Sequence, residues 1–326
     1  MALAFAPACL PMLRGGLPHA SAAEALALVT SATPDLPAWP ALIGRSFRET
    51  PLAQAAAGFP GVTIDPAYER ISVDHAAAEI GLDGLGLAYL RGEPGMGALS
   101  VDHAAGLGEL LRLAGSSQRA RALKGELLGP VSLALQLTDE EDRPLAYDPV
   151  LREALLHHLA LRVAWHHEQL SALGQQVILC LDEPFLAVLD LPLCPFEREE
   201  GLAMIARLLA DMPGCRGLCV GGAPDWATLL DLPLDLVIFD AYEHSAALLA
   251  AAQGVAAFLM RGGILGWGIV PVEPDALAHQ PANLLADRVL RDIDALAVAT
   301  GLARERILAA SLITSSDSLV TLSVQA

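Results

Sequence analysis

Four short segments place reactive or small residues directly after apolar runs of the chain. They are Gly15-Gly16-Leu17-Pro18-His19, Leu181-Asp182-Glu183-Pro184, Leu218-Cys219-Val220-Gly221-Gly222 and Phe239-Asp240-Ala241-Tyr242. Imidazole and carboxylate groups transfer protons, and a thiol becomes a nucleophile or a metal ligand once it is ionised. Polar residues at the carboxyl ends of parallel barrel strands gather at one mouth. We therefore expect one site that contains His19, Asp182, Cys219 and Asp240.

The elements that would position these residues alternate between strands and helices from Lys124 onward. Apolar runs predict strands at 124–128, 176–181, 217–220, 235–240 and 263–270, with 307–313 as the last element. Helices are predicted at 149–173, 197–210, 226–230, 244–253 and 283–300. This alternation implies βαβ units and a parallel sheet. With a first strand within Met1–Leu13, it predicts the α/β class and a single (β/α)₈ TIM barrel over residues 1–326.

The first third of the chain is less regular. Ser21 followed by Glu24 is a capping box, which predicts a helix through about Val29. The remaining elements are predicted as a proline-rich connection at 34–40, a helical tendency at 45–59, a hairpin at 62–73 and helices near 76–90 and 101–114.

Composition excludes two classes of partner. The formal net charge of −18 would repel a polyanion, so we expect no nucleic acid partner. The mean hydropathy of +0.46 is high, yet no apolar run approaches the roughly 20 residues of a membrane helix. A parallel sheet covered on both faces accounts for this apolarity, and we expect no membrane association.

Cysteine usage and the N-terminus bear on the compartment. The 5 cysteines show no C-x-x-C spacing and no disulfide framework. No basic residue precedes Arg14, so the start of the chain lacks the charged region of a secretory signal. We therefore expect a cytoplasmic protein with reduced thiols.

The order of these segments resembles the catalytic domain of cobalamin-independent methionine synthase. This domain belongs to a superfamily shared with uroporphyrinogen decarboxylase and corrinoid methyltransferases, and short single-barrel relatives are the most similar. The resemblance rests on Gly15–His19, Trp39-Pro40, Glu49, Gly129-Pro130, Asp182-Glu183-Pro184, Cys219, Asp225-Trp226, Phe239–Tyr242 and Ser315-Ser316-Asp317. It implies a methyltransferase of methionine biosynthesis that moves a methyl group to a thiol such as homocysteine.

The resemblance also implies a degenerate zinc site. The family's His-x-Cys corresponds to Gly217 and Cys219, its acidic ligand to Asp240 and its C-terminal cysteine to Asp317. One thiol and two carboxylates without imidazole suit zinc poorly, so weaker zinc binding than in the relatives is predicted. The alternatives are that Cys219 is a small buried hydrophobe, that Asp240 caps the next helix and that Asp317 belongs to a turn.

Further residues are implied as substrate contacts. Asp182 and Glu49 correspond to the acids that hold the substrate's amino group, and Gly16 replaces a serine that holds its carboxylate. His19 is an acid/base candidate, and Trp267 could stack on a planar group. Glu49 could instead pair with Arg45 on a helix surface, and Trp267 could be a core residue.

Several alternatives remain open at this stage. The chain has no room for a second barrel, so a corrinoid protein or a simpler compound is expected as the methyl donor. A non-catalytic barrel that binds a small molecule or a partner protein is one alternative. Another is a metal-free enzyme of the decarboxylase kind, with cations from Arg14, Arg45 or Arg48. The histidines at 157–158 and 166–167 are predicted to lie on a solvated helix face.

Overall fold

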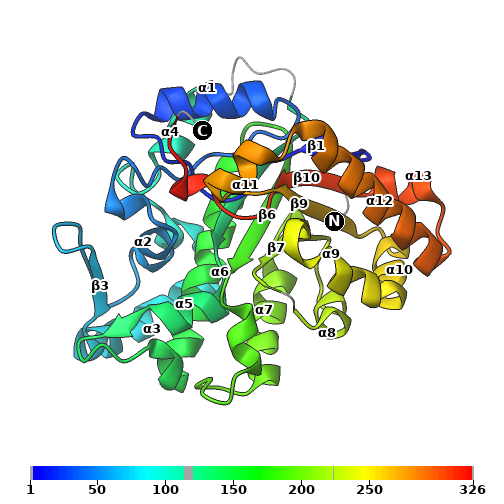
Figure 1. Ribbon diagram of the computed structural model, residues 1–326. Helices are drawn as coiled ribbons and strands as arrows, with labels where there is room; N and C mark the ends of the chain where they lie inside the picture. Colours follow the sequence, from blue (N-terminus) through cyan, green and yellow to red (C-terminus); the bar gives the residue numbers. More distant parts are fainter. Residues whose placement is uncertain (1–2, 114–119, 223, 325–326) are drawn as a thin grey trace.

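A curled parallel sheet forms the centre of the protein (Figure 1). The computed structural model describes residues 3–113, 120–222 and 224–324. The strand order is β1-β10-β9-β8-β7-β6-β4, and every neighbouring pair is parallel. The strands are β1 (Leu10–Pro11), β4 (Ala122–Leu128), β6 (Gln176–Glu183), β7 (Cys215–Val220), β8 (Leu236–Asp240), β9 (Ile264–Val270) and β10 (Ser311–Ser315). The predicted α/β class and parallel sheet are confirmed.

The sheet is a half-barrel, and among the described residues no continuous ladder closes it between β1 and β4. Residues 35–42 run through this gap, with single parallel bridges from Ala38 to Lys124 and from Leu42 to Leu17. The Lys124 N–H donates to Pro37 O at 3.1 Å. Prolines in this segment lack an N–H and cannot continue a ladder. Within the part of the chain that it describes, the structure therefore shows a half-barrel of seven strands, whereas a closed barrel of eight strands was predicted. The proline-rich connection lies along the open edge of this sheet.

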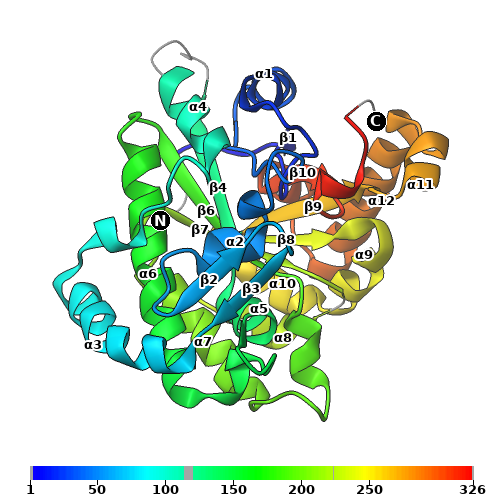
Figure 2. The same ribbon diagram turned by 90° about the vertical axis from the view of Figure 1, so that its left-hand side faces the viewer.

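Helices cover the outside of the sheet (Figures 1 and 2). They are α1 (Ala22–Ala32), α2 (Pro51–Ala56), α3 (His75–Arg91), α4 (Ala105–Leu113), α5 (Pro130–Gln136), α6 (Pro149–Ser171), α7 (Arg198–Asp211), α8 (Trp226–Leu230), α9 (Ala241–Ala250), α10 (Ala252–Met260), α11 (Pro274–His279), α12 (Ala282–Thr300) and α13 (Arg304–Ala309). The predicted helices have counterparts with shifted ends, except that the helix predicted at 244–253 spans the break between α9 and α10. Residue 114 lies outside the described residues. Among the described residues, no helix is long and apolar enough to span a membrane.

The strands separate two apolar cores, because successive side chains point to opposite faces. One core lies inside the curl of the sheet and includes Cys180, Cys219 and Ile238. The other lies between sheet and helices and includes Leu181 and Phe239. This alternation places Cys180 and Asp182, two residues apart on β6, on the inner face.

A small second sheet lies at the side of the half-barrel (Figure 2). Its strands are β2 (Val62–Asp65), β3 (Arg70–Val73) and β5 (Thr138–Asp139). β2 and β3 pair antiparallel, with Val62 opposite Val73. The predicted hairpin is therefore confirmed.

The histidines of α6 are mostly not solvated, so that prediction was wrong. His158 and His166 are buried, because this helix is covered on more than one side. The His158 ring Nε2 lies 2.9 Å from Ala55 O, and Arg162 donates to Ala57 O. These contacts satisfy carbonyls at the carboxyl end of α2, which α2 itself leaves without partners. The buried part of α6 thereby holds α2 against the half-barrel.

Candidate functional site

Three side chains from neighbouring strands meet near the carboxyl ends of the sheet. They are Glu126 of β4, Asp182 of β6 and Cys219 of β7, and their ligand atoms lie within 4.8 Å of one another. Strand register brings them together, because Asp182 is the direct pairing partner of Cys219. The predicted proximity of Asp182 and Cys219 is therefore seen, with Glu126 as a third member.

Two buried cations balance this acidic group. The Lys124 ammonium forms an ion pair with Glu126, and the Arg14 guanidinium lies 3.8 Å from Asp182 and 3.9 Å from Asp317. Lys124 and Arg14 are 1% and 3% exposed, so each would be costly to bury without a carboxylate partner. The site is thus a network of opposite charges rather than a set of free acids.

Arg14 also ties strand ends together. It donates to Ser316 O after β10 and to Val220 O at the end of β7, the second at 3.4 Å. These bonds fix the loop that carries Asp317 beside the end of β1. Arg14 therefore positions the site as well as neutralising it.

Burial and neighbouring charges shift the pKa values in the group. Burial and the nearby Glu126 carboxylate raise the pKa of Asp182 to about 7, against the opposing effect of Arg14. A hydrogen bond with Cys180, together with burial, raises the pKa of the Cys219 thiol. Burial lowers the pKa of Lys124, but the Glu126 charge outweighs this and raises it above its usual range. Near neutral pH, Lys124 is an ammonium and Cys219 a thiol.

A pocket opens over this group. Its lining residues come from the loop after β1, the 35–42 segment, α2 and the ends of β4 and β6: Gly15, Gly16, Trp39, Ala41, Pro51, Gln54, Glu126, Leu127, Leu128, Asp182 and Ser318. The side chain of Asp182 is 21% exposed. No described residue forms a hydrogen bond with its Oδ1. This oxygen is itself buried and lies 3.8 Å from the Arg14 guanidinium, so a ligand in the pocket would meet the exposed remainder of the Asp182 carboxyl group.

The two glycines of the pocket wall use their backbone N–H groups within the protein. Gly15, at φ +69°, donates to Glu126 Oε1 at 3.0 Å, and Gly16 donates to Ser318 Oγ at 3.1 Å. A Cβ at Gly16 would lie 2.8 Å from Ala41 O, so a side chain there would push the backbone segments apart. Gly16 thus lies in the pocket as predicted, with its N–H turned to Ser318.

Glu183 fixes the direction in which Asp182 leaves the strand. It is fully buried and accepts from the Val131 and Ser132 N–H groups at 2.9 and 2.8 Å. These are orphan donors at the start of α5. Because Glu183 faces α5, its neighbour Asp182 faces the inside of the half-barrel.

Glu49 and His19 lie away from the residues that line the pocket. Glu49 is fully buried in the turn η1 (Phe47–Glu49), where it accepts from Leu42 N at 3.0 Å and pairs with Arg45 at 2.9 Å. The alternative pairing with Arg45 is therefore present, but in a buried turn rather than on a surface. His19 is 6% exposed, and no described residue bonds its Nδ1.

The three other predicted site residues, Asp240, Asp317 and Trp267, lie outside the group formed by Glu126, Asp182 and Cys219. Asp240 caps α9 by accepting from Glu243 N at 3.0 Å. Asp317 is 70% exposed and reaches the group only through Arg14. Trp267 is fully buried, and its indole donates to Ser311 Oγ at 3.0 Å. None of the three belongs to the cluster of possible metal ligands among the described residues.

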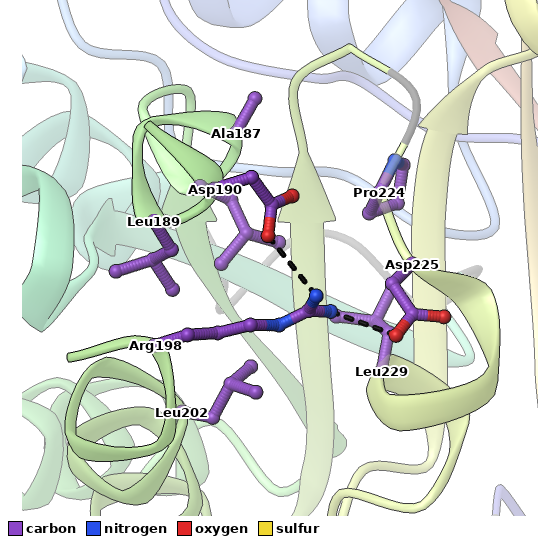
Figure 3. A pocket seen from close by; sticks show the side chains of 9 residues that line it. Ala187, Leu189, Asp190, Arg198, Leu202, Pro224, Asp225 and Leu229 are labelled. Atoms are coloured by element: carbon purple, nitrogen blue, oxygen red, sulfur yellow. Dashed lines mark hydrogen bonds and ion pairs between the residues drawn. The ribbon is translucent and has the colours of Figure 1, made fainter. Parts of the chain in front are cut away.

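A second pocket lies beside the loops after β6 and β7 (Figure 3). Arg198 crosses it, with ion pairs to Asp190 at 3.0 Å and Asp225 at 2.8 Å. Asp190 ends the turn η4 (Leu186–Asp190), and Asp225 caps α8. Arg198 therefore joins the two loops that follow the strands of Asp182 and Cys219.

Lys124 and Glu126 were missed in the sequence, although a signal was present. They occur two residues apart in a predicted strand, so they share a face. That face is the inside of the half-barrel. Moreover, Lys124 is the one lysine among 20 Lys and Arg residues in the chain.

The donor set does not suit zinc. It consists of one thiol and two carboxylates, whereas zinc favours thiolate and imidazole ligands. Gly217 stands where the sequence resemblance implied a histidine in methionine synthases, and an added Cβ at Gly217 would overlap the Sγ of Cys180. Lys124 already occupies one side of Glu126. A different cation could still be shared by Glu126, Asp182 and Cys219, since their ligand atoms are close enough.

Comparisons with known proteins establish the fold only. No family model matches the chain, and no curated protein matches it. A methyltransferase from Methanosarcina mazei has a TM-score of 0.56 at 12% identity, over 98% of this chain and 90% of that protein. A protein from Listeria monocytogenes, provisionally described as a vitamin-B12-independent methionine synthase, has a TM-score of 0.44 at 14% identity. That alignment covers 67% of this chain and 64% of the Listeria protein.

Proposed function

We propose that this chain is a methyltransferase that binds a small amino-acid thiol, such as homocysteine, at Asp182. The observation that carries the proposal is the Asp182 carboxylate, whose side chain is 21% exposed in the wall of a pocket. A half-buried carboxylate is favourable only when water, a cation or a ligand amine meets it. The fold shared with a methyltransferase supports the reaction class.

The pocket offers complementary groups for such a ligand. The ligand's ammonium would pair with Asp182, and its sulfur would lie toward Glu126 at the floor. In the transfer, the sulfur forms the new bond to the methyl carbon as the bond from that carbon to the donor breaks. The electron pair of the broken bond leaves with the donor, and the thiol proton leaves to a base such as Glu126. We propose a methyl-corrinoid protein, or a simpler methyl compound, as the donor.

Calorimetric titration with homocysteine and methionine tests the binding step. Asp182→Asn keeps the volume but removes the charge, and it should weaken binding by about 2–5 kcal/mol, or at least 30-fold. The matched control is Asp83→Asn, an exposed carboxylate on α3, which should leave binding unchanged. Failure of the parent protein to bind either compound, or equal binding by Asp182→Asn, would contradict the proposal.

A transfer assay separates this proposal from the second candidate, a barrel that binds without methyl transfer. The second candidate is favoured by the cations already present in the site, since Lys124 pairs with Glu126 and Arg14 lies 3.8 Å from Asp182. Incubation with homocysteine and methylcobalamin should yield methionine in the presence of the parent protein, and much less with Asp182→Asn. Tight binding of homocysteine without methionine formation from this or a simpler methyl donor would favour the second candidate.

A further inference from the structure

The cation at the floor of the site belongs to the chain itself. The Lys124 ammonium lies inside the half-barrel, 1% exposed, and is paired with Glu126. Glu126 Oε2, its partner atom, also lies 3.7 Å from the Cys219 sulfur. Lys124 therefore pairs with one of the three donor groups that a metal ion would share, and a second, the Cys219 sulfur, lies against the same Glu126 oxygen.

The choice of lysine at this position is unusual for this chain. Its other Lys and Arg residues are all arginines, including the buried Arg14 and Arg162. Arginine presents a planar fork, whereas lysine presents a compact charge with three donors at the end of a flexible stem. A compact charge resembles a bound metal ion more closely than a guanidinium does.

The surroundings of Lys124 are built to keep it charged. Glu126 is held from its other side, because Gly15 N donates to Oε1 at 3.0 Å. The ammonium in turn forms an ion pair with Glu126 Oε2. The space that the family's histidine would need at Gly217 is taken by the Cys180 sulfur.

We propose that the Lys124 ammonium replaces the metal ion of this site, so that Glu126, Asp182 and Cys219 form a complete group without a metal. The role is that of a fixed countercharge that positions Glu126 and offers a positive charge near the sulfur of Cys219. The proposal is independent of which ligand the pocket takes, because its test uses a metal ion alone.

Cobalt(II) titration of the full chain is the experiment. Cobalt bound to a thiolate gives a charge-transfer absorption band in the near ultraviolet. The parent protein should give no such band, and the signal of its single isotopically labelled lysine side chain should not broaden. Lys124→Met removes the charge at similar length, and it should bind cobalt at least about 100-fold more tightly, with the band. Lys124→Arg should behave as the parent does.

Further variants assign the signal and guard against misfolding. The band of Lys124→Met should vanish in Lys124→Met with Cys219→Ser, which removes the sulfur ligand. If Lys124→Met is unfolded on its own, cobalt should refold it, because a ligand that binds only the folded state stabilises that state. The proposal is overturned if the parent gives the band with one cobalt per chain. It is also overturned if Lys124→Met neither binds cobalt nor refolds with it.

Discussion

Asp182→Asn should stabilise the protein at alkaline pH and weaken the proposed binding of an amine ligand. In the folded protein, Asp182 keeps its proton up to about pH 7, whereas its ordinary pKa is 3.8. Between these values the unfolded chain releases a proton that the folded protein holds. The free energy of unfolding therefore falls as pH rises through this window, and the stabilisation present at low pH is lost above pH 7.

The magnitude follows from the difference between the two pKa values. A separation of about 3 units, at 1.36 kcal/mol per unit, gives about 4 kcal/mol as an upper limit. The 21% exposure of the side chain lets water reduce this cost. We therefore expect Asp182→Asn to raise the free energy of unfolding by about 1–4 kcal/mol at pH 8.

Urea unfolding at pH 5, 6, 7 and 8 measures this difference. The gain from Asp182→Asn should be smallest at pH 5 and level off above pH 7, because asparagine does not titrate. Asp83→Asn, on the exposed surface of α3, should show no such trend. A constant difference between Asp182→Asn and the parent, or a less stable variant at pH 8, would refute the reasoning. Either result would mean that Arg14 satisfies the ionised Asp182.

Three further predictions concern Asp182 and two positions near it, Glu183 and Gly217. The affinity for an amine-bearing ligand should rise about tenfold from pH 6 to pH 8 as Asp182 ionises, and a pH-independent affinity in calorimetry would count against this. Glu183→Ala should lower the free energy of unfolding by about 2–4 kcal/mol, since it leaves two helix donors unpaired; Glu243→Ala, at an exposed site, is the control in urea unfolding. Gly217→Ala should destabilise by about 1–3 kcal/mol through overlap with Cys180, and a double-mutant cycle with Cys180→Ala should recover most of that loss.

The sequence predicted most elements because their signals are local. Strands such as β6 and β9 are short apolar runs, and Ser21 caps α1 by accepting from Glu24 N at 3.4 Å. The order of strands and helices then determined the parallel sheet. The 35–42 segment escaped prediction because its prolines give the signal of a loop, although its backbone is held by Lys124.

Of the candidate site, the sequence predicted Asp182 and Cys219 but neither Glu126 nor Lys124. Asp182 and Cys219 end strands, so their convergence follows from parallel pairing. Glu126 and Lys124 lie within β4 rather than at its end. Which face of a strand points into the half-barrel depends on the curvature of the sheet, and the sequence does not show that curvature. Glu49 carries the sequence pattern of a surface pair, yet tertiary packing buries it against Leu42. Burial by distant segments has no local signature.

The charges of the site determine which kind of ligand group it favours. Lys124 is committed to Glu126, while Arg14 is shared between Asp182 and the exposed Asp317. Three carboxylates thus face two cations, and the deficit falls on Asp182, whose pKa is raised by burial. A positively charged ligand group at Asp182 would correct that deficit, whereas a divalent metal ion would have to compete with Lys124. The same imbalance therefore favours an amine over a metal at the mouth of the half-barrel.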